Sequence, residues 1–116
     1  MKKSEQLAIN EQVLNALTEF NSDSVSLCTD HWRQLRKCSA SVAPAVDKET
    51  GEVLYYVLRS YRTIVAIIDI KTDTLIDFLR YVYGYTSTSA QHISKFNQDY
   101  GMGKWGCTNR VTYRDI

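Results

Sequence analysis

A cluster of hydroxyl side chains ahead of a histidine and a lysine is the first group that could do chemistry. Its members are Thr86, Ser87, Thr88 and Ser89, followed by His92 and Lys95. Hydroxyls, backbone N–H groups at a helix start and a nearby cation can together hold a phosphate. Candidate contacts to a phosphate or a nucleic acid are therefore Ser87, Ser89, His92 and Lys95. The alternative is structural: the hydroxyls cap a helix, with Thr88 and Gln91 as a capping box, and His92 packs in the core.

Aromatic and arginine residues form the second group. Tyrosines are concentrated between residues 55 and 85, and the C-terminal tail adds tryptophan, tyrosine and arginine. Such side chains are frequent hot spots of protein interfaces, and they also stack on single-stranded bases. The residues predicted to bind a partner are Tyr83, Tyr85, Trp105, Arg110 and Arg114.

The cysteines and histidines do not form a pattern that indicates metal binding or covalent catalysis. Cys28 and His31 have the spacing of a ligand pair, but the second pair that a structural zinc needs is missing. His92 has no cysteine partner in a recognisable turn with an oxyanion donor, which argues against a nucleophilic dyad. We therefore expect Cys28, Cys38 and Cys107 to be free thiols, and we expect no metal, no cofactor and no enzymatic activity.

Three aspartates spaced by four could attract a divalent cation if they lay on one helix. They are Asp69, Asp73 and Asp77. The threonines between them are typical of a turn, so the sequence favours a solvated acidic turn instead.

Composition limits the class of protein. The chain has 116 residues, with 14 basic and 13 acidic side chains and a net charge of +1. This balance excludes a strongly basic nucleic-acid coat protein and an acidic DNA mimic. The sequence shows no apolar run long enough for a membrane span and no signal-like N-terminus, and it has three cysteines. We expect a cytosolic protein with reduced thiols.

The apolar periodicity predicts a single α+β domain over residues 1–116. Residues 1–38 are expected to be a helical N-terminal part and residues 39–116 a sheet plus a helix, with about four antiparallel strands. The expected helices are 4–20, 29–37 and 87–100, and the expected strands are 40–46, 52–59, 63–69 and 110–113. The segment Thr63–Asp69 is apolar on both faces, which predicts the centre of a sheet covered on both sides. Residues 75–85 fit both a helix and a strand, and their tyrosines favour a strand in the second half.

Two segments resemble the motifs of a known family. Ser60–Asp69 has the form S-Y-x-T-x-V-A-x-I-D. Tyr85–Phe96 is similar to Y-S-x-T-T-x-x-H-x-x-x-F, with Thr86 at the serine and Ser89 at the second threonine. Together they resemble a small uncharacterised domain family of phages and mobile elements of Gram-positive bacteria. The resemblance covers residues 55–100. It implies a phage or mobile element as the source of the protein, and it does not imply a particular activity.

The leading hypothesis is a non-enzymatic phage or mobile-element protein that inhibits a host defence complex. An anti-CRISPR protein that binds a Cas effector fits the small size, the balanced charge, the lack of a catalytic pattern and the implied source. The alternative is a DNA-binding transcriptional regulator that uses the helix 87–100. The sequence leaves open the identity of the partner and whether the protein forms a homodimer.

Overall fold

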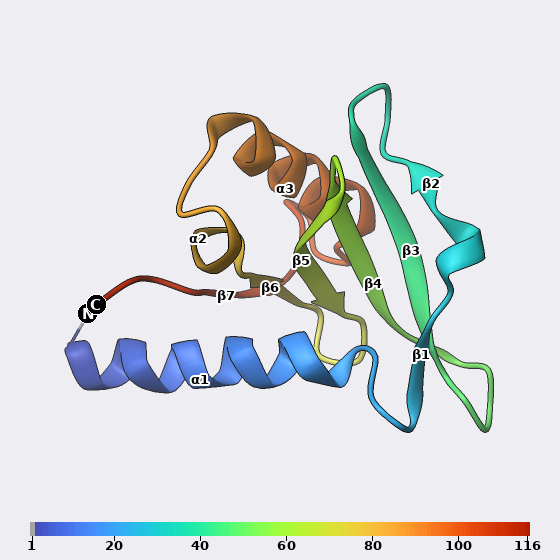
Figure 1. Ribbon diagram of the computed structural model, residues 1–116, viewed down its shortest axis with the longest axis horizontal. Helices are drawn as coiled ribbons and strands as arrows, with labels where there is room; N and C mark the ends of the chain where they lie inside the picture. The colour runs from blue at the N-terminus through green and yellow to red at the C-terminus, as the bar shows by residue number, and fades with distance from the viewer. Residues whose placement is uncertain (1) are drawn as a thin grey trace.

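A mixed β-sheet with helices on both faces forms the centre of the fold (Figure 1). The computed structural model describes residues 2–116. The helices are α1 (Lys3–Glu19), α2 (Leu79–Val82) and α3 (Ser87–Tyr100), and a 3₁₀ turn spans Thr29–His31. The strands are β1 (Val25–Leu27), β2 (Arg33–Gln34), β3 (Ala40–Asp47), β4 (Val53–Ser60), β5 (Thr63–Asp69), β6 (Thr74–Asp77) and β7 (Asn109–Thr112).

The strand order is β1-β3-β4-β5-β6-β7, with β2 paired to the same strand β3 as β1. Neighbouring strands are antiparallel except β6 and β7, which are parallel. The α+β class is confirmed. The expected sheet of about four antiparallel strands is wrong, because the sheet has seven strands and is mixed.

The strand β5 is buried on both faces, as its sequence predicts. Its bounds are the expected ones, and Ile67 and Ile68 are at most 1% exposed. Ile67 belongs to the apolar cluster that contains Val13 of α1. Ile68 belongs to the cluster that contains Phe96 of α3. The two helices therefore cover opposite faces of the sheet, which explains why this strand has no polar face.

The segment 29–37 does not form the expected helix, so the helical N-terminal part ends far short of residue 38. After the 3₁₀ turn, Arg33 and Gln34 pair with Val42 and Ser41 of β3. Arg36 has a φ of 51°, a left-handed conformation that cannot continue an α-helix. Backbone pairing with β3 therefore prevails over the helical pattern of this segment.

In the segment 75–85 a strand forms in the first half, whereas the sequence favours a strand in the second half. Leu75 and Ile76 are buried in β6, and the chain then turns into α2. The Oδ1 atom of Asp77 accepts the backbone N–H of Leu79 at 3.1 Å, which helps to turn the chain into this short helix. The tyrosines of the second half lie outside the sheet, so the strand expected there is wrong.

Two buried amides of α1 hold the C-terminal segment. The side chain of Asn10 donates to the carbonyl of Arg114 at 2.7 Å and accepts its N–H at 3.0 Å. Gln6 donates to the carbonyl of Thr112 at 3.1 Å and to Asn10 at 2.8 Å. Asn10 thus takes the place of a neighbouring strand for residue 114, which a purely apolar helix face could not do.

We predict that Asn10→Ala lowers the free energy of unfolding by about 2 kcal/mol, because it leaves backbone groups of Arg114 without partners. Urea unfolding measures this loss. The matched control is Asn15→Ala, at an exposed position of the same helix, which should change stability little. Equal stability of the two variants would contradict the role given to Asn10.

Candidate functional site

The two motif segments of the family resemblance meet inside the protein. The Oγ atom of Ser60 lies 2.8 Å from Nδ1 of His92 and 2.9 Å from Oγ of Ser89. These three residues are at most 4% exposed. Burial, and secondarily the charge of Lys95, lowers the pKa of His92, so the ring is neutral near pH 7. This cluster ties α3 to the end of β4.

The predicted phosphate contacts are therefore divided between the surface and the interior. Ser89 and His92 are buried, whereas Ser87 is exposed and Lys95 is partly buried. The backbone N–H of Ser89 donates to Oγ1 of Thr86 at 3.3 Å, so Thr86 is the N-cap of α3. Hydroxyl capping is confirmed, but not by the expected pair of Thr88 and Gln91, because the helix begins one residue before that pair.

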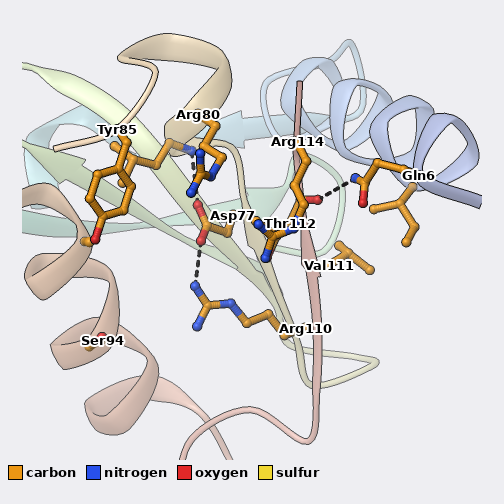
Figure 2. Close-up of a pocket in the computed structure, with 12 residues that line it drawn as sticks. Gln6, Asp77, Arg80, Tyr85, Ser94, Arg110, Val111, Thr112 and Arg114 are labelled. Atoms are coloured by element: carbon orange, nitrogen blue, oxygen red, sulfur yellow. Dashed lines mark hydrogen bonds and ion pairs between the residues drawn. The ribbon is translucent and has the colours of Figure 1, made fainter. Parts of the chain in front are cut away.

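A pocket of about 590 Å³ lies between α1, β7, α2 and α3 (Figure 2). Three arginines from different elements line it: Arg80 of α2, Arg110 of β7 and Arg114 of the tail. Asp77 is the one acidic residue of the lining. The charged side chains of the pocket therefore sum to +2.

Asp77 holds Arg110 in place. Its Oδ2 atom is 2.6 Å from Nη2 of Arg110, and its side chain is 7% exposed against 50% for the arginine. Its Oδ1 atom is taken by the N–H of Leu79. Both oxygens of the carboxylate therefore have hydrogen-bond partners inside the protein. Most N–H donors of the Arg110 guanidinium stay free for a ligand.

An aromatic ring forms one wall of the pocket. The guanidinium carbon of Arg80 lies 5.2 Å from the ring centre of Tyr85, which is 58% exposed. Ser94 of α3 also lines the pocket. The site thus combines three arginines with an exposed aromatic ring, an arrangement that suits an anionic ligand with an aromatic or planar part.

Trp105 lies apart from this pocket, on the loop between α3 and β7, and is 83% exposed. Asn97 accepts the N–H of Cys107 at 2.7 Å, which closes the loop onto α3. A Cβ atom on Gly106 would come within 2.5 Å of the Asn97 side chain, so only glycine fits there. The loop is held firmly while its tryptophan faces solvent.

Asp73 fastens the other side of this loop. Its carboxylate accepts the N–H of Met102 at 3.0 Å, and the N–H and hydroxyl of Thr108 at 2.9 Å and 2.7 Å. These hydrogen bonds, led by the Thr108 hydroxyl, lower the pKa of Asp73 to about 2. The expected solvated acidic turn is wrong for Asp73 and Asp77, which are 8% and 5% exposed, because each is needed as an internal hydrogen-bond acceptor.

We predict that Asp73 stabilises the fold above pH 4. Its folded pKa of about 2 is below the unfolded value of about 3.9, so this stabilisation is lost as the pH falls from about 4 to 2. Asp73→Asn keeps a residue type that tolerates the φ of 50° at this position. It should cost about 2 kcal/mol at pH 7 and reduce the loss of stability between pH 4 and 2.

Unfolding titrations of Asp73→Asn beside the exposed Asp23→Asn test this prediction. An unchanged pH profile for Asp73→Asn, or an equal effect of the control, would rule out the proposed role of Asp73.

The structure brings three of the five predicted partner-binding residues into one pocket. Tyr85, Arg110 and Arg114 line it, whereas Tyr83 is the C-cap of α2 and Trp105 stands on its own loop. Sequence reasoning missed Arg80, and it placed Asp77 in a solvated turn rather than in a buried ion pair with Arg110. The signal for Arg80 was its position among tyrosines, since arginines and aromatic rings together are typical of binding surfaces.

Within residues 2–116, no three or more histidine, cysteine, aspartate or glutamate side chains gather as metal ligands would. None of the helices in this range has the length and apolar character needed to cross a membrane. Comparisons of the chain with protein-family models, with curated proteins and with solved structures find no match.

Proposed function

We propose that this protein is a non-enzymatic binding protein of a phage or mobile element, and that it inhibits a host defence complex in the host cytoplasm. The partner proposed is a Cas effector. The observation that carries the binding role is the convergence of three arginines and Tyr85 on one pocket. The resemblance of residues 55–100 to a phage and mobile-element family supports the choice of partner.

The pocket has the properties of an interface anchor. Arg110 is oriented by a buried carboxylate before any partner arrives. The backbone of Arg114 is fixed by Asn10 through two hydrogen bonds. Preorganised side chains lose less conformational entropy on binding, so more of the contact energy contributes to affinity.

The Trp105 loop supplies a second anchor. Trp105 and Met102 are 83% and 69% exposed on one short loop. Large exposed apolar side chains on a rigid support are typical of protein interfaces. With a net charge of only +1, the protein would block its partner by shape and by local anchors rather than by imitating DNA.

The alternative function, a DNA-binding regulator that reads DNA with α3, has less support in the geometry. Two of its four proposed contacts, Ser89 and His92, are 2% and 4% exposed. Ser87 and Lys95 would have to make the contacts almost alone. Binding of the free protein to duplex DNA therefore separates the two functions.

Target cleavage by a Cas effector loaded with its guide should be inhibited by the wild-type protein. Arg114→Ala and Trp105→Ala should each weaken inhibition about thirtyfold, since truncation of an interface anchor costs about 2 kcal/mol. Arg62→Ala, in the exposed turn between β4 and β5, and Leu7→Ala, on the exposed face of α1, are the matched controls and should inhibit normally.

The proposal fails if the protein leaves cleavage unchanged. It also fails if the free protein binds duplex DNA with an affinity that falls steeply with salt and depends on Lys95 but not on Trp105. That second result would establish the regulator instead.

A further inference from the structure

We infer that the arginine pocket binds a phosphate monoester carried on a nucleoside, either as a free nucleotide or at the 5′ end of a strand. The inference deepens the proposed function, because it names the chemical group that the same pocket takes. It rests on the charge, the donors and the shape of the pocket.

The charge of the pocket matches a dianion. The lining side chains carry three positive charges and one negative charge. A phosphate monoester has a charge of about −2 at pH 7, whereas a carboxylate has −1. A phosphate would therefore neutralise the excess charge of +2, and a carboxylate would leave part of it unpaired.

The donors are arranged for an oxyanion with several acceptors. Each guanidinium presents five N–H donors in a planar fork, which matches phosphate geometry. Arg110 gives one of its nitrogens to Asp77 at 2.6 Å and keeps the others. The side chains of Arg80 and Arg114 make no hydrogen bond or ion pair to residues 2–116, so their donors are available.

The shape leaves room for more than a phosphate. A volume of about 590 Å³ falls within the range of pockets that hold a small organic ligand, roughly 300–1,000 Å³. The exposed ring of Tyr85 stands beside Arg80 at the wall of the pocket. Aromatic rings in such positions stack on nucleobases, so the base would lie against Tyr85 while the arginines hold its phosphate.

Calorimetric titrations of the purified protein with AMP, adenosine and inorganic phosphate test the inference. AMP should bind, adenosine should not bind measurably, and inorganic phosphate should bind more weakly than AMP. Arg80→Ala and Arg114→Ala should each weaken AMP binding about tenfold or more. Arg62→Ala is the control of equal charge change and should bind AMP within about twofold of wild type. Arg110→Ala is avoided, since it would leave the buried Asp77 unpaired.

Parallel titrations with a short oligonucleotide, with and without a 5′ phosphate, separate the two sources of the group. Tighter binding of the phosphorylated strand than of AMP points to strand ends, and the reverse points to a free nucleotide. The inference is overturned if AMP does not bind, if adenosine binds equally well, or if Arg62→Ala weakens binding as much as the pocket variants.

The outcomes are distinguishable from those of the proposed function. Inhibition of a Cas effector that depends on Arg114, without AMP binding, keeps the proposed function and rejects the nucleotide. AMP binding that depends on Arg80 and Arg114, without inhibition of any effector tested, keeps the nucleotide site and rejects the proposed function. Circular dichroism of each variant confirms that it folds.

Discussion

The contact between the buried carboxylate of Asp77 and the guanidinium of Arg110 is the interaction on which the candidate site depends. Asp77 ends β6, and its backbone carbonyl accepts the N–H of Tyr113 at 2.8 Å. Its side chain also accepts the N–H of Leu79, where α2 begins. One residue thus joins a strand, a helix and the C-terminal segment. Removing Arg110 would leave the buried carboxylate of Asp77 without its charged partner, which is destabilising.

The segment that supplies most of the proposed contacts has little regular structure of its own. Between Gly101 and Arg114 it forms the four-residue strand β7 and an isolated bridge. Asp73 holds its beginning through Met102 and Thr108, and Asn10 holds its end. Buried polar side chains therefore supply hydrogen-bond partners for the backbone of this segment, as neighbouring strands do in the rest of the sheet. These hydrogen bonds hold the backbone of the segment, while the side chains of Trp105 and Arg114 stay exposed.

Elements whose position follows from apolar periodicity can be predicted from the sequence. Buried polar residues whose hydrogen-bond partners are distant in the sequence cannot. The bounds of β5 and the general course of α1 and α3 follow from apolar spacing. The burial of Asp73 and Asn10 does not, because their partners lie 35 and 104 residues away. Tyr85, Arg110 and Arg114 could be chosen as binding residues from their type. Their convergence with Arg80 could not, since it depends on the parallel pairing of β6 and β7.

We conclude that Arg80, Arg110 and Arg114 act together as one site. The most direct measurement is an NMR titration with AMP that follows the Nε–Hε signals of the arginine side chains. The signals of the three pocket arginines should shift and saturate at the same AMP concentration, while those of Arg36 and Arg62 should stay in place. Equal small shifts of all arginine signals, or no shift in the three pocket arginines, would contradict it.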